Sequence, residues 1–335
     1  MIISKTPYRI SFFGGGSDYP EWYLKNGGVV ISTTINKYIY ISCRSLPPYF
    51  RHKHRISYSK IEQVKKISDI RHAVVQKALD KFKKKINKQG LEIHYDGDFP
   101  SRSGVGSSSS FAVGLLNVLN NFFNKKINKR ALANQSLHLE RTILKETVGS
   151  QDQVAAAFGG FNEIKFLKSD KYQVTPLITN KKELKTLQEK FVLVFTGVRK
   201  KNGTANTVAK AYIDKLDNTK KKYILEIIGH AKKAKKLIYN KDYDAFGRLL
   251  NTTWEMKKNL SDNMSNTKID KMYDLGLRHG ALGAKLLGAG SAGYLLFYVP
   301  TKKKKNFLKK FKKFITISLK FENKGSEIIF NDKGN

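Results

Sequence analysis

The sequence contains one cysteine and no long apolar segment, and both absences exclude classes of protein. Cys43 alone cannot form an intrachain disulfide, and no Cys/His cluster has the spacing of a zinc site. No apolar stretch approaches the roughly 18 residues of a membrane span. The N-terminal stretch MIISKTPYRISFFGGG lacks the basic region and apolar run of a signal peptide. These absences fit a protein of the reducing cytoplasm, and we expect that location.

Acidic residues are also few. The chain has 27 Asp and Glu against 63 Lys and Arg, a formal net charge of +36, which raises nucleic acid or another polyanion as a partner. The lysines do not form one block, however, but are spread through predicted helices, as in KFKKKINK and TKKKKNFLKKFKKF, often beside asparagine. This distribution favours solvated helix faces. The alternatives are a field that attracts phosphorylated small molecules and a surface for nucleic acid.

Length and composition indicate two globular domains. The chain has 335 residues, of which 40% are hydrophobic and 11% aromatic. It is long enough to bury a sizeable core and longer than one typical core requires. Predicted strands and helices alternate without the regular order of βαβ units, which is typical of an α+β fold. We place the domain boundary near residue 185, between segments 1–185 and 186–335.

Local patterns predict the individual elements. Alternation of apolar residues indicates strands, and a spacing of three or four indicates helices. The predicted strands are YRISFF, GGVVISTTI, KYIYISC, RISYSK, LEIHYDGDF, FNEIKFL, YQVTPL, FVLVFTG, two strands within AKLLGAGSAGYLLFYV, FITISLKF and SEIIF. The predicted helices are 69–85 with an aspartate cap, 107–123, 130–145, a short one at GSQDQVAAAF, 204–216, 220–238, 243–260, 268–280 and a basic helix near the C-terminus.

The stretch PSRSGVGSSSSFAVGLLNVL, residues 100–119, is a glycine-serine turn that opens an apolar helix. Gly104 and Gly106 allow the backbone to curl, and the free N–H groups and dipole of a helix start attract phosphate oxygens. The lysine of a P-loop is absent. A serine hydroxyl here can reach a Mg²⁺ ion held by the same phosphates. A serine-rich helix cap is the structural alternative, but four consecutive serines exceed what a cap requires.

Two further glycine-rich turns occur in the chain. In TPYRISFFGGGSDY, Arg9 leads into the glycines and is a candidate phosphate contact, and Asp18 beyond them is a candidate contact for sugar hydroxyls. A plain hairpin turn with a capping aspartate is the alternative. In GAKLLGAGSAGYLLFY, Gly288, Gly290 and Gly293 lie between two apolar strands, a pattern that many hairpins share.

Taken together and in this order, the three turns resemble the motifs of the GHMP kinase superfamily, which are P-x-R/K…G, P-x-x-x-G-L-G-S-S-A and a C-terminal glycine motif. Within it, the chain is similar to the D-glycero-D-manno-heptose 7-phosphate kinases in RISFFGGGSD, LPPYFRHKHRISYSK, GVGSSSSFAVGLLN, VGSQDQVAAAFGGFN, FTGV and GAKLLGAGSAGYLLFY. The resemblance extends from Ile2 to about Pro300. Val105 replaces the usual leucine, Thr6 the usual alanine, and Ser291 with Ala292 interrupts the last glycines.

The resemblance implies a role for each matching residue. Asp152 in GSQDQ matches an aspartate near the acceptor hydroxyl, as a base or an orienting group. Arg9 matches the basic residue that neutralises charge on the transferred phosphoryl group. Ser108 and Glu140 match the Mg²⁺ ligands, with Glu146 as an alternative to Glu140. The implied ATP-binding residues are Gly104, Val105, Gly106, Ser107, Ser108 and Ser109, and the implied substrate-binding residues are Gly15, Gly16, Ser17, Asp18, Gly288 and Gly290.

A phosphorylated sugar also needs donors for its own phosphate. We favour Arg199, with Lys200 and Lys201, because an arginine fork binds phosphate through two parallel hydrogen bonds. A solvated basic turn is the structural alternative for this group. Arg102 in the central loop and the basic loop FRHKHR are the other candidates.

The implied fold is a two-domain α+β GHMP kinase fold: the N-terminal domain is like ribosomal protein S5 domain 2, the C-terminal domain is ferredoxin-like, and the active site lies between them. The implied reaction is phosphorylation of D-glycero-D-manno-heptose 7-phosphate by ATP, with Mg²⁺, at the anomeric hydroxyl. Its product, heptose 1,7-bisphosphate, would feed nucleotide-activated heptose synthesis for surface polysaccharide.

The expected partners are ATP and the sugar phosphate, with neither nucleic acid nor a membrane. Two alternatives stay open: a GHMP kinase for free fucose or galactose, and a nucleic-acid-binding protein on the same fold.

Overall fold

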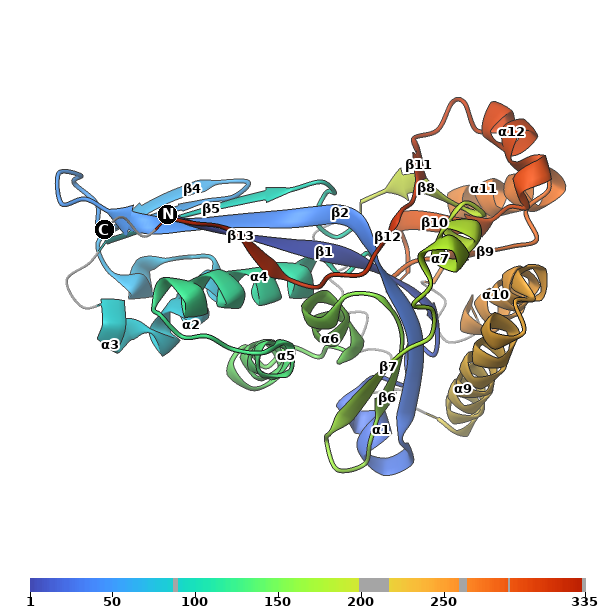
Figure 1. Cartoon of the computed structure of the whole chain (residues 1–335), viewed down its shortest axis with the longest axis horizontal. Helices are drawn as coiled ribbons and strands as arrows, with labels where there is room; N and C mark the ends of the chain where they lie inside the picture. The colour runs from blue at the N-terminus through green and yellow to red at the C-terminus, as the bar shows by residue number, and fades with distance from the viewer. Residues whose placement is uncertain (87–89, 199–216, 259–263, 289, 333–335) are drawn as a thin grey trace.

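The structure of the protein is a computed structural model that describes residues 1–86, 90–198, 217–258, 264–288 and 290–332 (Figure 1). Its strands form one sheet of nine strands and one of four. Helices cover one face of the long sheet and lie beside the short one (Figure 1). The α+β class predicted from the sequence is confirmed.

The long sheet is built around strands β1 and β2. These two strands pair antiparallel from Ile2 opposite Cys43 to Phe13 opposite Ile31. One path through the sheet has the order β13-β1-β2-β5-β3-β4, while β6 and β12 pair with β2, and β7 pairs with β6. The bounds are β1 Ile2–Phe13, β2 Gly28–Leu46, β3 His54–Ser57, β4 Ile61–Val64, β5 Gly90–Gly97, β6 Phe161–Phe166, β7 Tyr172–Pro176, β12 Phe321–Glu322 and β13 Glu327–Asn331.

Strand β2 is continuous, so the prediction of two separate strands in this region is wrong. The predicted break fell at Asn36. In the structure, the Asn36 N–H donates to the carbonyl of Lys320, and the Lys320 N–H donates to Asn36 Oδ1 at 3.0 Å. These two hydrogen bonds pair the polar groups of Asn36 at the position where the sequence predicted a break between two strands. The register with β1 shifts between Pro7 and Arg9, which marks an irregularity in the ladder rather than a turn.

Helices α2 to α6 lie along one face of this sheet (Figure 1). Their bounds are α2 Ala73–Lys81, α3 Lys83–Ile86, α4 Ser107–Phe122, α5 Lys129–Leu137, the π-helix η2 His138–Ile143 and α6 Gln151–Phe158. Helix α4 confirms the predicted helix 107–123 and contacts β1 and β2. Every residue from Ser109 to Asn120 is buried, so α4 is the centre of the core.

The predicted helix 69–85 is shorter and broken in the structure. A 3₁₀ turn, η1 (Ile67–Asp69), precedes α2, which begins after His72 rather than at Asp69. The carboxylate of Glu62 accepts the backbone N–H groups of Arg71 at 2.6 Å and of His72 at 3.1 Å. The cap therefore comes from a neighbouring strand, which the local sequence does not reveal.

The short sheet has the order β11-β8-β10-β9. Its strands are β8 Phe191–Gly197, β9 Gly283–Leu286, β10 Gly293–Tyr298 and β11 Thr316–Ser318, and the helices of this half are α9 Asn218–Tyr239, α10 Tyr243–Lys258, α11 Thr267–Arg278 and α12 Thr301–Lys310. The predicted helices 220–238, 243–260 and 268–280 are confirmed as α9, α10 and α11. The predicted helix 204–216 lies outside the described residues.

Aromatic packing joins the two sheets. The ring of Phe12 on β1 lies 5.2 Å from the rings of Phe161 and Phe191 and 5.5 Å from that of Phe246. All four side chains are buried. Because burial of such rings dominates core energetics, the end of β1 is held firmly against the second half of the molecule.

The chain returns to the first sheet after the second is complete. Strand β12 pairs with β2, and β13 pairs with β1. A boundary near residue 185 stays a prediction, and both β12 and β13 pair with the sheet of the first half although they follow that boundary.

Two helices, α1 (Pro20–Asn26) and α7 (Lys181–Gln188), were not predicted. Asn180 caps α7 by accepting from the N–H groups of Lys182 and Glu183.

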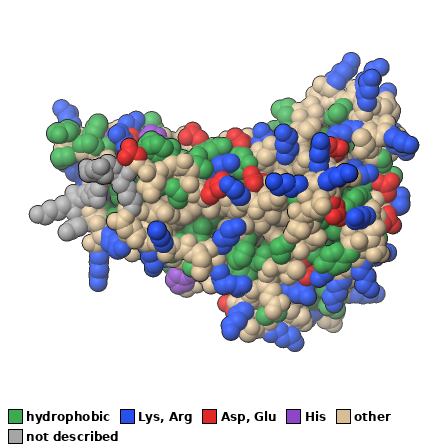
Figure 2. Space-filling view, in the orientation of Figure 1, with side chains coloured by type: hydrophobic (Ala, Val, Ile, Leu, Met, Phe, Trp, Pro, Cys, Tyr) green, Lys and Arg blue, Asp and Glu red, His purple; other side chains and the backbone are tan. Residues whose placement is uncertain are grey.

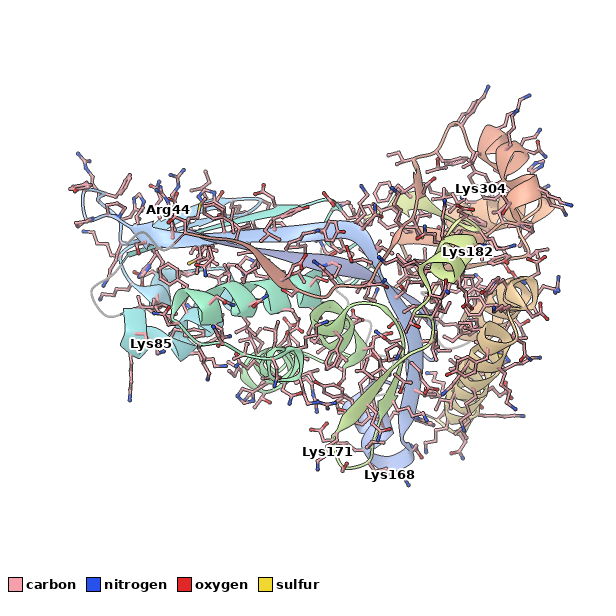
Figure 3. All side chains as sticks on the ribbon, in the orientation of Figure 1. Arg44, Lys85, Lys168, Lys171, Lys182 and Lys304 are labelled. Atoms are coloured by element: carbon pink, nitrogen blue, oxygen red, sulfur yellow. The ribbon has the colours of Figure 1, made fainter. Side chains whose placement is uncertain are left out.

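Lysine and arginine side chains are spread over the visible face (Figure 2). The labelled cations lie in several parts of the molecule (Figure 3): Arg44 on β2, Lys85 on α3, Lys168 and Lys171 together between β6 and β7, Lys182 on α7 and Lys304 on α12. This view agrees with charge distributed over many solvated surfaces. Among the described residues, no helix combines the length and apolarity that a membrane crossing requires.

Candidate active site

The central glycine-serine turn presents the start of α4. Gly106 is the residue before the helix and has φ 79°, while Gly104 has φ 86°, so both occupy the left-handed region that favours glycine. A Cβ on Gly106 would lie 3.2 Å from Arg9 Cγ and 3.3 Å from Asp152 Oδ2. The free N–H groups of the first turn of α4 are thus held beside the two side chains predicted to perform the chemistry.

Arg9 and Asp152 form a bidentate ion pair. Arg9 Nε donates to Asp152 Oδ1 at 2.7 Å, and Nη2 donates to Oδ2 at 2.6 Å. The remaining guanidinium nitrogen, Nη1, donates to the carbonyl of Gly104 at 2.8 Å. Arg9 is almost fully buried, whereas the Asp152 side chain is 21% exposed. One face of the aspartate is therefore accessible while its orientation is fixed.

Asp18 lies behind this pair. Its Oδ1 accepts the N–H of Gly16 at 2.9 Å, and its Oδ2 accepts the N–H of Gln151 at 3.4 Å. Burial raises the pKa of Asp18, and the nearby charge of Asp152 adds to that rise. A Cβ on Gly149 would lie 2.0 Å from Asp18 Oδ2, so the approach of these two segments depends on a glycine.

Glu140 lies in the π-helix η2 and is completely buried. It accepts hydrogen bonds from Ser108 at 3.4 Å, from Ser109 at 3.0 Å and from the amide of Gln153. Burial is the main cause that raises the pKa of Glu140 to about 8. A π-turn inside a helical segment is common at functional sites, because it redirects one side chain.

The Glu140 carboxylate and the Ser108 hydroxyl fit a Mg²⁺ ion. Mg²⁺ prefers oxygen ligands and is often held by one or two carboxylates together with the phosphates of its substrate. No group of three or more His, Cys, Asp or Glu side chains suited to a metal occurs in the described part of the chain. The donor set is thus too small for a dedicated all-protein site, but it suits a metal that arrives with a nucleotide. The alternative ligand, Glu146, is half-buried, and its N–H donates to the carbonyl of Glu140 at 2.9 Å.

The C-terminal glycine turn packs on the central turn, backbone against backbone. A Cβ on Gly288 would lie 2.5 Å from Gly104 Cα, and one on Gly293 would lie 2.3 Å from the Ser103 carbonyl oxygen. Gly288, Gly290 and Gly293 all have positive φ. Close packing against the central glycine-serine turn therefore accounts for Gly288 and Gly293, and direct substrate contact by Gly288 or Gly290 stays a prediction.

The remaining predicted site residues differ in burial, and some of them lie outside the described residues. Ser17 is fully buried, and its hydroxyl donates to the carbonyl of Gly14 at 2.8 Å, so this side chain supports the turn. Val105 is buried, and its carbonyl accepts the N–H of Arg9 at 3.1 Å. Arg102 is exposed, with φ 62°. Arg199, Lys200 and Lys201 lie outside the described residues.

One buried cation near the site was not predicted. Lys285 on β9 is 4% exposed, and its Nζ donates to the carbonyl of Phe12 at 2.7 Å. Its position in the apolar strand GAKLL is the sequence signal, because a lysine within such a run is rarely buried without a partner. Gln153, the residue after Asp152, was not predicted either. Its side-chain amide donates to the carboxylate of Glu140.

Comparison with known proteins identifies the family of the chain. Residues 73–160 match the family model for the GHMP kinases N-terminal domain, and residues 234–314 match that for the GHMP kinases C-terminal domain. The chain is 29% identical to D-glycero-alpha-D-manno-heptose 7-phosphate kinase of Campylobacter jejuni, over 93% of each chain. It is 32% identical to mevalonate kinase of Methanocaldococcus jannaschii, over 68% of this chain and 67% of that protein.

A solved structure shares the whole fold. The crystal structure of a D-glycero-D-manno-heptose 1-phosphate kinase from Bacteroides thetaiotaomicron covers 99% of this chain and is itself covered completely, with a TM-score of 0.81 and 22% identity. The fold and the family matches define an enzyme, an ATP-dependent phosphotransferase with an alcohol acceptor. The chain belongs to the GHMP kinase family.

Proposed function

We propose that the protein is a sugar kinase that transfers the γ-phosphoryl group of Mg²⁺-ATP to the anomeric hydroxyl of D-glycero-D-manno-heptose 7-phosphate. The observation that carries the proposal is the ion pair of Arg9 and Asp152, which lies beside Gly106 at the end of the glycine-serine turn. The likeness to the heptose 7-phosphate kinase of Campylobacter jejuni, over 93% of each chain, supports this acceptor. The product is heptose 1,7-bisphosphate, a precursor for nucleotide-activated heptose.

Asp152 orients the acceptor and receives its proton late in the reaction. The hydroxyl oxygen forms a bond to the γ-phosphorus, the bond from that phosphorus to the bridging oxygen of ADP breaks, and the proton passes to a carboxylate oxygen of Asp152. Two charge-assisted hydrogen bonds from Arg9 hold this carboxylate in a fixed orientation. Strong base catalysis is not required, because phosphoryl transfer has a loose transition state and depends mostly on positioning and charge stabilisation.

The phosphates of ATP lie against the start of α4 in this proposal. The backbone N–H groups of residues 106–109 and the helix dipole hold the phosphate oxygens. Arg9 supplies the positive charge that a P-loop lysine supplies elsewhere. Ser108 and Glu140 hold the metal, and Mg²⁺, when bound, neutralises charge on the phosphate oxygens.

An assay of ADP release over a panel of sugars tests the proposal. The panel contains heptose 7-phosphate, heptose 1-phosphate, the free heptose, galactose and fucose. We expect kcat/KM to be highest with heptose 7-phosphate. Higher kcat/KM with a free sugar favours the first alternative, and it removes the need for a phosphate contact by Arg199 or Arg102.

The nucleic-acid alternative has its own readout. Sequence-independent binding of single- or double-stranded oligonucleotides with a steep salt dependence, together with no turnover of any sugar, supports that alternative and contradicts the kinase proposal.

A further inference from the structure

The first glycine-rich turn contains one glycine that the fold does not require. Gly14 has φ 83°, and a Cβ there would lie 1.9 Å from the carbonyl oxygen of Val29, so a side chain is excluded. Gly16 has φ 107°, a region that favours glycine. Gly15 has no positive φ, and the nearest atoms to a Cβ would be Ser11 Oγ at 3.4 Å and Gln151 Nε2 at 3.8 Å. Neither backbone conformation nor packing explains the absence of a side chain at position 15.

The space above Gly15 is lined by buried polar groups that lack hydrogen-bond partners. Ser11 is 6% exposed and Gln151 is 7% exposed. Within the described part of the chain, neither Ser11 Oγ nor Gln151 Oε1 has a partner. Ser32 lies directly opposite Ser11 in the β1–β2 ladder. Its hydroxyl is also buried and has no hydrogen-bond partner among the described residues. Buried polar groups are nearly always hydrogen-bonded, so these atoms have hydrogen-bonding capacity that a ligand hydroxyl can use.

This space adjoins the reacting groups. Ser11 follows Arg9 by two positions in a regular part of β1, so the two side chains lie on the same face of the strand. Gln151 immediately precedes Asp152 at the start of α6, and its N–H donates to Asp18 at 3.4 Å. The space over Gly15 is therefore bordered by Ser11, which shares a strand face with Arg9, and by Gln151, which precedes Asp152 and donates to Asp18.

We propose that Ser11 and Gln151 form a hydroxyl-binding pocket over Gly15 that takes one ring hydroxyl of the acceptor sugar, other than the one that is phosphorylated. This inference rests on the proposed sugar-kinase function. The Gln151 amide offers both a donor and an acceptor, and the Ser11 hydroxyl can serve as either. A site built to hydrogen-bond a hydroxyl strongly rejects an analogue that lacks it, because its own polar groups then stay unpaired. The pocket thus determines specificity for the pattern of sugar hydroxyls.

Ser11→Ala and Gly15→Ala test the pocket. The first removes a hydroxyl, and the second places a methyl group in the space at ordinary contact distance from Ser11. For both variants we expect the KM for the sugar to rise roughly tenfold or more, in line with the loss of one buried hydrogen bond. The KM for ATP stays within about twofold. The melting temperature of Ser11→Ala is unchanged or higher, because the deleted hydroxyl has no partner within the described protein.

Ser4→Ala is the matched control. Ser4 is also a buried serine on β1, but it lies near the opposite end of the strand from the turn, and its hydroxyl donates to the carbonyl of Gly114 at 3.0 Å. This variant should lower the melting temperature and leave both KM values unchanged. A rise of the sugar KM in Ser4→Ala equal to that in Ser11→Ala would overturn the pocket assignment.

Deoxy sugars identify the hydroxyl that the pocket holds. Binding of heptose 7-phosphate and of single-deoxy analogues is measured by calorimetry without ATP. One analogue should lose affinity with the wild-type protein but lose no further affinity with Ser11→Ala, which is the coupling that a direct contact produces. If the sugar binds and additive losses are found for every analogue, the pocket proposal falls while the kinase proposal stands. If no sugar of the activity panel binds the wild-type protein, both proposals fall.

Discussion

Lys285 on β9 and Phe12 at the end of β1 are joined across the two sheets by a hydrogen bond of 2.7 Å from the lysine Nζ to the phenylalanine carbonyl oxygen. Burial lowers the pKa of Lys285 well below its ordinary value, and the positive charges of Lys257 and Arg9 lower it further. This contact connects the second half of the molecule to the strand that carries Arg9.

Replacement of Lys285 should change how stability depends on pH. Below its unfolded-state pKa of about 10.4 the lysine is protonated in the unfolded chain, while the folded protein disfavours the proton. The unfolded state therefore binds more protons over the range from the lowered pKa to about pH 10, and stability gains with rising pH there. Lys285→Met removes this dependence, so its melting temperature relative to wild type should fall as pH rises from 7 to 10. Calorimetry at three pH values measures this slope, and Lys305→Met, an exposed lysine on α12, should show none.

Asp152→Asn should fold and bind ATP but lose most turnover. The amide cannot accept a proton and offers one acceptor oxygen where Arg9 now meets two. We expect kcat to fall about 10²- to 10⁴-fold and the melting temperature to fall, because the buried Arg9 loses its charged partner. Asp170→Asn, at an aspartate whose side chain is 52% exposed and pairs with Arg141, is the control and should keep kcat. A near-normal kcat in Asp152→Asn would falsify the catalytic role.

Ser108→Ala should weaken use of Mg²⁺-ATP more than binding of the sugar. The hydroxyl is one of the two oxygen ligands proposed for the metal, and it lies 3.4 Å from Glu140. We expect the KM for ATP to rise several-fold and higher Mg²⁺ to restore part of the rate. Steady-state kinetics at varied Mg²⁺ measure both effects. Ser101→Ala, an exposed serine of the same loop, is the control, and a selective change in the sugar KM of Ser108→Ala would contradict the assignment.

Gly288→Ala should push the C-terminal glycine turn away from the central glycine-serine turn. A Cβ there would lie 2.5 Å from Gly104 Cα, and the φ of 78° adds strain for a residue with a side chain. We expect a loss of roughly 1–3 kcal/mol in the free energy of unfolding and a higher KM for ATP, because the loop that starts α4 must shift. Gly229→Ala is the matched control: a Cβ there meets nothing within 4 Å, on helix α9. Denaturant unfolding should show Gly229→Ala to be neutral or slightly stabilising.

Local sequence predicted those parts of the site whose chemistry is local. The turn before α4 was recognised because two glycines and four serines precede an apolar helix. Arg9 and Asp152 were selected separately, and the structure places them within hydrogen-bond distance although 143 positions separate them in the chain. Their pairing, like that of Gly104 with Gly288, depends on tertiary contacts that no local pattern records.

The missed features share this long-range origin. The break predicted at Asn36 is bridged by Lys320, 284 residues away, and the cap of α2 comes from Glu62 on another element. The pocket over Gly15 is formed by residues 11 and 151, which come together only when α6 docks beside β1. Glycine at position 15 looked like the other glycines of its turn, and only the backbone angles and clearances in the folded structure distinguish it.

The return of β12 and β13 to the first sheet has a consequence for synthesis of the chain. Ser4 is paired with Ile328, and the hydroxyl of Thr6 meets that of Ser326 across a separation of 320 residues. A ribosome that has released all of residues 1–185 has therefore produced a sheet whose β1 edge is still uncovered. Unpaired strand edges readily recruit other strands, so the nascent protein carries an association-prone surface until its last strand emerges. We therefore expect the growing chain to depend on chaperone protection of this edge until β13 has paired.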